Sequence, residues 1–214
     1  MPVVTIRGRL GSGAPEVGRG VAQKLHADFV DREIIAEVAA RLHLGEPDVI
    51  AKEMPPASLH GRIAAALERG FSMGAGFEGT YLPVWEIPLD DTRYLEALGT
   101  LITELASGRP IVIYGRGSQF ILRDHPRALH VLITAPLDVR LKRVMESLKL
   151  NEEPARREIE RFDESSRQFI RKYFRTEWED PLHYDLVINT EHLPYEAATS
   201  IVIDGLNFKG ARTA

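Results

Sequence analysis

Short apolar runs rich in β-branched residues alternate along the chain with stretches that have helical spacing. The runs lie at residues 3–6 (VVTI), 29–31 (FVD), 111–115 (IVIYG), 129–134 (LHVLIT) and 184–190 (YDLVINT). Apolar runs of this length are typical of strands buried on both faces of a parallel sheet. Because helical stretches separate them, the pattern predicts a three-layer α/β fold in which helices cover both faces of a five-stranded parallel sheet.

The helical stretches are marked by apolar residues three and four positions apart and by the residues that precede them. Pro15 stands at a first helical position before Val17 and Val21, and Asp31 can cap a helix over residues 32–42. The same signals predict helices at 58–69, from Asp90 or Asp91 through Leu105, after Pro136, at 152–175 and at 194–206.

Residues 43–91 break the regular alternation. Prolines and glycines are frequent there and are mixed with aromatic residues, as in FSMGAGFEGTYLPVWEIP. The segment is interpreted as a small inserted lobe with one helix and a long loop. A loop of this length in a compact domain is functional or disordered. Alternatively, the aromatic residues of 71–90 pack on a second copy of the chain and form a homo-oligomer; the sequence leaves both options open.

Composition excludes several classes of protein. The formal net charge of the 214 residues is −4, so general nucleic-acid binding has no electrostatic support. No apolar run is long enough to span a membrane. The chain has no cysteine, which excludes disulfides and thiolate metal sites and fits a cytoplasmic location. The histidines form no His-x-x-x-His pair, so no zinc site is expected.

The loop after the first predicted strand, GRLGSGAPEVG, has the glycines of a phosphate-binding loop. Their backbone N–H groups can turn inward around an anion, and the following helix adds its positive end. Ala14 and Pro15 stand where the motif has lysine and a hydroxyl residue, and Ser12 is the hydroxyl inside the loop. The expected phosphate-binding residues are Gly8, Gly11, Ser12, Gly13 and Ala14. The alternative is a tight turn that binds no ligand.

The ordered set of segments resembles the cytidylate kinase-like family. The segments are VVTIRGRLGSGAPEVGRGVAQKL at the start, IVIYGRGSQFIL (111–122), LHVLITAPLDVRLKRV (129–144), IERFDESSRQFIRKYF (159–174) and YDLVINT (184–190). The resemblance implies one domain over 1–214 with strand order 2-3-1-4-5, an acceptor-binding lobe at 43–91 and a basic helical lid at 150–175. It also implies ATP and Mg²⁺, with a nucleoside monophosphate such as CMP as acceptor.

Arginine suits phosphoryl transfer because its planar fork grips phosphate oxygens in pairs. By resemblance, Arg116 and Asp31 contact the acceptor, although Arg116 could be a surface residue and Asp31 a helix cap. Arg140, Arg161 and Arg167 are the expected catalytic residues, and the alternative for each is a solvated helix face. Arg143 is left open between the same two roles. No side chain is assigned as a direct metal ligand.

Three functions fit these observations. The first is an active phosphotransferase in which arginines replace the missing loop lysine. The second is a non-catalytic nucleotide-binding or regulatory protein, which the residues Ala14 and Pro15 favour. The third is a scaffold that oligomerises through the aromatic loop, against which the clustered arginines of 150–175 argue.

Overall fold

The computed structural model describes residues 1–31 and 92–211 of the chain. The strands are β1 (Val3–Gly8), β2 (Asp28–Val30), β3 (Ile111–Tyr114), β4 (Ala128–Thr134) and β5 (Leu186–Asn189). The helices are α1 (Ala14–Leu25), α5 (Thr92–Gly108), α6 (Ser118–Ile121), α7 (Leu137–Leu148), α8 (Glu152–Phe174) and α9 (Tyr195–Ala211), with a 3₁₀ turn at Pro181–His183. Two compact units divide the chain: Pro2–Phe29 with Pro110–Ala214, and Val30–Arg109 with Met1.

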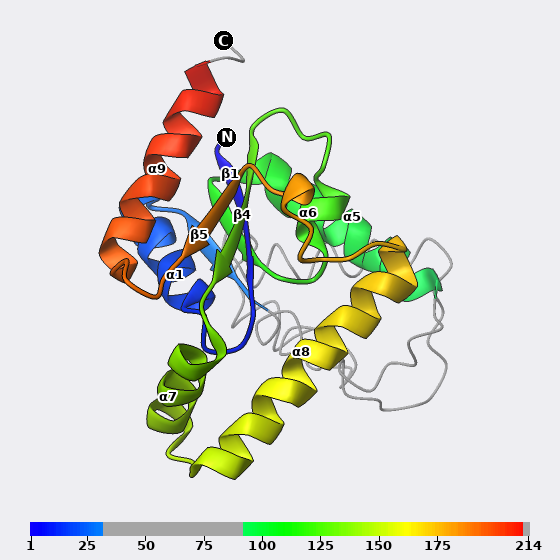
Figure 1. Ribbon diagram of the computed structural model, residues 1–214. Helices are drawn as coiled ribbons and strands as arrows, with labels where there is room; N and C mark the ends of the chain where they lie inside the picture. Colours follow the sequence, from blue (N-terminus) through cyan, green and yellow to red (C-terminus); the bar gives the residue numbers. More distant parts are fainter. Residues whose placement is uncertain (32–91, 212–214) are drawn as a thin grey trace, which may run out of the picture. The chain divides into compact units, whose positions relative to one another are not determined.

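The five strands form one sheet in the order β2-β3-β1-β4-β5, which confirms the expected topology. β1 lies between β3 and β4 and is parallel to both, with Val3 opposite Ile111 and Ala128. β5 continues the sheet in parallel beyond β4. All carboxyl ends therefore lie along one edge, where the loop between β1 and α1 begins (Figure 1).

Helices α1 and α9 cover one face of this sheet and lie side by side in Figure 1. Their apolar residues Val17, Val21 and Val202 pack with Ile6 of β1 and Val131 of β4. The spacing of these side chains is that of an amphipathic helix facing a sheet, as the sequence predicts. This packing holds the start of α1 close to the end of β1.

The opposite face carries a second apolar cluster. Leu132, which alternates with Val131 along β4, packs there with Ile170 of α8 and with Trp178. The ring centroids of Phe120 and Phe174 are 4.9 Å apart and add a stacked aromatic pair. The C-terminal half of α8 and the segment that follows it are thereby anchored to the sheet.

Sequence-based element boundaries agree closely with the structure in several places. The expected helix at 152–175 is α8, while α9 continues to Ala211 rather than ending near 206. The short helix α6 and the 3₁₀ turn are additional elements, and no periodic pattern in the sequence predicts them. The helices expected at 32–42 and 58–69, the 43–91 lobe and the 71–90 aromatic loop lie outside the described residues.

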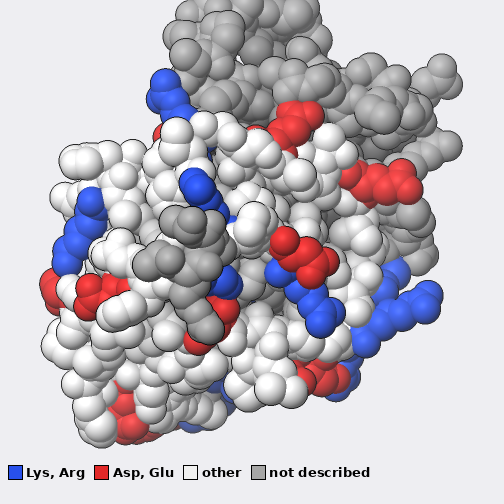
Figure 2. Space-filling view, turned by 90° about the horizontal axis from the view of Figure 1, so that it is seen from above, with Lys and Arg blue, Asp and Glu red and all other residues white. Residues whose placement is uncertain are grey.

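The molecular surface mixes charges of both signs. Figure 2 shows Lys and Arg interspersed with Asp and Glu on the face seen there. Across residues 1–31 and 92–211, no helix is both long and apolar enough to cross a bilayer.

His130 is expected to make folding stability depend on pH. It lies on β4, is 7% exposed, and its Nδ1 is 2.8 Å from the hydroxyl oxygen of Thr5. Burial lowers the pKa of His130 from its ordinary value of 6.5. The unfolded chain therefore binds a proton near pH 6.5 that the folded chain still excludes. Urea denaturation should show stability falling as pH drops below about 6.5, then levelling below the folded pKa; His130→Gln should remove this component.

Candidate functional site

The loop between β1 and α1 is shaped by two glycines with left-handed backbone. Gly11 has φ 80° and Gly13 has φ 84°, a region that other residues rarely adopt. A Cβ at Gly11 would meet the carbonyl oxygen of Arg140 at 2.6 Å, and one at Gly13 would meet the Tyr195 ring at 2.3 Å. The conformation and the space available at both positions therefore require glycine.

The base of the loop is filled by small side chains. A Cβ at Gly8 would lie 2.4 Å from the hydroxyl oxygen of Ser12 and 2.7 Å from the Cβ of Ala14. Ser12 and Ala14 are fully buried. In the part of the chain that the structure describes, the Ser12 hydroxyl has no hydrogen-bond partner. The five residues expected to bind phosphate thus form one compact turn.

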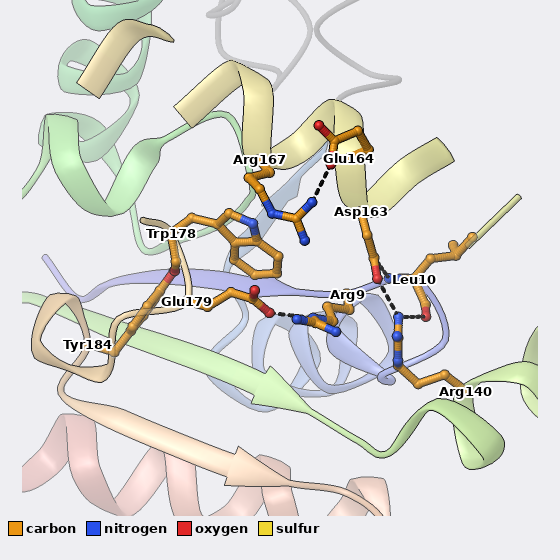
Figure 3. A network of polar contacts seen from close by, with 9 residues as sticks. All are labelled: Arg9, Leu10, Arg140, Asp163, Glu164, Arg167, Trp178, Glu179 and Tyr184. Carbon is orange, nitrogen blue, oxygen red and sulfur yellow. Dashed lines mark hydrogen bonds and ion pairs between the residues drawn. The ribbon is translucent and has the colours of Figure 1, made fainter. Parts of the chain in front are cut away.

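A buried ion pair fastens the loop to α7 and α8 (Figure 3). Arg140 of α7 donates to Asp163 of α8 over 2.8 Å and to the carbonyl oxygen of Leu10 over 3.2 Å. Asp163 also accepts from the Leu10 N–H over 3.4 Å. The side chains of Arg140 and Asp163 are 2% and 11% exposed. Arg140, expected to be catalytic, lies in this structure beneath the loop, where it holds Leu10.

Arg143 fastens the next part of the loop. Its guanidinium donates to the carbonyl oxygen of Thr190 over 2.7 Å, to the Thr190 hydroxyl over 2.9 Å and to the Gly11 carbonyl over 3.3 Å. The Thr190 hydroxyl in turn donates to the Ser12 carbonyl over 2.7 Å. Arg143 also lies over the Tyr195 ring, 5.2 Å from its centroid.

These contacts leave loop donors available. The carbonyl groups of Leu10, Gly11 and Ser12 are all bonded to side chains outside the loop. The Ser12 N–H donates within the loop to the carbonyl oxygen of Arg9. Within the described residues, the N–H groups of Gly11, Gly13 and Ala14 donate to no acceptor. They stand at the positive end of α1, which is the arrangement that binds an anion.

Arg9 brings a positive charge into the loop itself. Its Nε donates to Glu179, which follows α8, and this ion pair is partly exposed (Figure 3). The hydrogen bond to Glu179 raises the pKa of Arg9. Sequence reasoning did not select Arg9, although its place between Gly8 and Gly11 is a signal that could have found it.

The structure separates the two arginines expected on α8. Arg167 is 31% exposed and forms an ion pair with Glu164. Its side chain extends from α8 toward Trp178 (Figure 3). Arg161 is 74% exposed and is bonded to Glu158. Because Arg161 lies two positions from buried Asp163, it is on the opposite side of the helix. The structure therefore does not bring Arg161 to the loop.

The two expected acceptor contacts lie after strands. Arg116 follows β3 with φ 56°, between Gly115 and Gly117, which are also left-handed. Asp31 follows β2 and belongs to the other compact unit. Their contacts with an acceptor stay predictions.

A metal ligand set is not evident in the described part of the chain, where no three His, Asp or Glu side chains could hold an ion together. The expectation that no side chain ligates a metal directly is not tested by this, and Mg²⁺ stays a proposal.

Comparison with known proteins decides the family. The model of the cytidylate kinase-like family matches residues 3–192, which include the loop, α7 and α8. The chain belongs to the cytidylate kinase-like family. A curated cytidylate kinase of Halobacterium salinarum is 28% identical over 123 residues, which are 57% of this chain and 64% of that protein. The match thus spans less than two thirds of the relative.

Solved structures similar to this member of the cytidylate kinase-like family support the fold. An uncharacterized protein from Eubacterium ventriosum has a TM-score of 0.69 at 19% identity and covers 97% of this chain and 99% of its own. A gluconokinase from Sinorhizobium meliloti has a TM-score of 0.50 at 15% identity, covering 99% and 95%. A shikimate kinase from Bacteroides thetaiotaomicron has a TM-score of 0.50 at 13% identity, covering 96% and 98%. The family and the fold are those of nucleotide-dependent kinases.

Proposed function

We propose that the protein transfers a phosphoryl group from ATP, with Mg²⁺, to a nucleoside monophosphate of the CMP type. One observation carries this proposal. The N–H groups of Gly11, Gly13 and Ala14 face no acceptor within the described residues, while the carbonyl groups of Leu10, Gly11 and Ser12 are bonded to side chains outside the loop. A preorganised set of backbone donors at a helix N-terminus stabilises phosphate without a lysine.

Positive charge near the loop would come from arginines. Arg9 lies in the loop, and Arg167 extends from α8 in the region assigned as the lid. Both are held by single carboxylates at partly exposed positions, so a phosphate group can compete for them at little cost. In this proposal Arg140 and Arg143 position the loop, and Arg116 and Asp31 contact the acceptor.

A direct assay tests this function. The chain is incubated with ATP and Mg²⁺ and with each common nucleoside monophosphate, and ADP formation is followed together with the phosphorylated product. Transfer to CMP above the rate with cytidine supports the proposal. ATP hydrolysis without transfer to any monophosphate contradicts it.

A non-catalytic nucleotide-binding role is the second candidate, favoured by Ala14. The methyl group of Ala14 is fully buried and carries no charge, so this position cannot supply the positive charge of the usual lysine. Calorimetry separates the two candidates: ATP binding with heat but without any transfer in the assay selects the non-catalytic role. A membrane site or nucleic-acid site is not part of either candidate.

Arg9→Gln is expected to lower kcat/KM by about 10²–10³-fold, the effect of removing one donor to transition-state charge. Glu179→Gln removes the competing carboxylate and should leave kcat/KM equal or higher. Arg156→Gln is the matched control, because Arg156 is also an arginine in a partly exposed ion pair, with Glu152. Equal kcat/KM for Arg9→Gln and Arg156→Gln would show that Arg9 has no part in transfer.

A further inference from the structure

Arg7 is a buried arginine one residue before the loop. It lies on the face of β1 turned away from α1, since Ile6 packs against α1 and successive residues of a strand alternate. Arg7 is 8% exposed, and its Cζ is 4.9 Å from the centroid of the Trp178 ring. A Cβ at Gly115 would lie 3.3 Å from its NH1, so the guanidinium also contacts the turn after β3.

The charge of Arg7 has no counter-ion in the described part of the chain. Arg7 makes no ion pair or hydrogen bond there, and its Nε is buried without an acceptor. The carboxylates whose charges reach it are Asp163 and Glu179, and these are bonded to Arg140 and Arg9. Burial lowers the pKa of Arg7, yet a guanidinium stays charged in proteins. A buried charge without a partner is unfavourable, and an anion would relieve it.

The surroundings of Arg7 hold further unused polar atoms. Trp178 is 1% exposed, and its Nε1 donor is buried without an acceptor in the described residues. Gln119 donates to the Tyr184 hydroxyl over 3.1 Å, and Tyr184 donates to the Trp178 carbonyl, so these side chains are fixed relative to one another. The Oε1 of Gln119 also lacks a partner there and suits a hydroxyl of a ligand. The site thus offers N–H donors on rigid supports.

We propose that Arg7 binds the phosphate group of the acceptor. This rests on the proposed function and extends it: the acceptor carries a phosphate monoester, which the guanidinium binds through paired hydrogen bonds. Arg7 lies at the carboxyl end of β1 and directly precedes Gly8, the first residue of the loop. The acceptor phosphate therefore lies next to the loop that holds the donor phosphates, as direct transfer requires.

Thermal unfolding of two variants tests this site. Arg7→Met removes the charge but keeps an apolar stem under Trp178, and Arg123→Gln is a control at an exposed arginine. Without ligand, Arg7→Met should unfold at a higher temperature than the native chain, because an unpaired buried charge is gone. CMP should raise the Tm of the native chain and of Arg123→Gln, while its Kd for Arg7→Met should be about tenfold to a hundredfold higher. An unchanged Kd for Arg7→Met would overturn the proposal.

Fluorescence gives a measurement that keeps Arg7 in place. The chain has two tryptophans, Trp85 and Trp178, so Trp85→Phe leaves Trp178 as the reporter above the guanidinium. Titration with CMP or inorganic phosphate should change its emission, whereas cytidine and acetate should not. Equal responses to cytidine and CMP would show that the nucleoside is bound without this phosphate contact. A response to acetate equal to that with phosphate would identify a carboxylate site and overturn the assignment.

The outcome for Arg7 is separable from that for the proposed function. If no phosphoryl transfer occurs but CMP binding depends on Arg7, the function fails and the binding site stands. If transfer to CMP occurs with equal KM in the native chain and in Arg7→Met, the function stands and this site fails.

Discussion

Asp163→Ala is expected to lower the free energy of unfolding by about 3–5 kcal/mol, because it leaves the Arg140 guanidinium buried without its carboxylate. Arg140 is 2% exposed, so water cannot replace the lost partner. The Leu10 N–H would lose its acceptor in the same step. Urea denaturation followed by circular dichroism measures this loss. For a protein of ordinary stability, it is a large share of the total.

A double variant shows whether the loss arises from the stranded charge. Asp163→Leu combined with Arg140→Met replaces the pair with apolar side chains and should recover much of the stability. Glu158→Ala, which breaks the exposed pair with Arg161, is the matched control and should leave stability nearly unchanged. If the double variant is no more stable than Asp163→Ala, the interaction energy lies in the loop contacts instead.

Gly13→Val is expected to abolish ATP binding in calorimetry up to millimolar concentrations. A β-branched residue is strongly disfavoured at φ 84°, and its Cβ would lie 2.3 Å from the Tyr195 ring. The loop must therefore change conformation, and the donors at Gly13 and Ala14 lose their alignment. The sequence alone suggests that a side chain at this position would crowd the phosphate, and the structure adds the Tyr195 ring as a second obstacle.

Two variants control for this result. Gly99→Val places the same side chain on a helical glycine whose added Cβ meets no atom within 4 Å among the described residues, and ATP affinity should not change. Gly13→Ala in a Tyr195→Ala background removes the ring but keeps the backbone constraint, so it should recover part of the affinity. Normal ATP affinity in Gly13→Val would show that the loop does not hold the nucleotide.

The local features of this fold follow from sequence, because neighbouring residues determine them. The run at 3–6, the glycines and Pro15 together indicate a strand, a turn and a helix, and β1, the loop and α1 occur there. Because the loop directly follows β1, it lies at the carboxyl end of the sheet. For the same reason α8 was predicted with nearly correct ends.

Contacts between distant segments do not follow from sequence in this way. Arg9 and Glu179 are 170 positions apart, and nothing in either segment indicates the other. Arg140 was expected to face the donor because its helix follows β4. Its position along that helix does not indicate that it is the arginine buried where α7 and α8 pack together. Arg161 is different: its offset from the buried Ile159 and Asp163 already places it on the solvent side.

The two links between the loop and α8 have a mechanical consequence. Leu10 is held by Asp163 near the middle of α8, and Arg9 by Glu179 just beyond its end. A movement of α8 as a rigid rod would either pull the loop backbone along or break the Leu10–Asp163 hydrogen bond and the Arg9–Glu179 ion pair. A ligand that bound at the loop and favoured one orientation of α8 would be thermodynamically linked to that orientation, and each would bias the other by the same free energy. In this protein α8 and the loop between β1 and α1 are connected at two points, so a displacement of one end of the helix reaches the loop backbone directly.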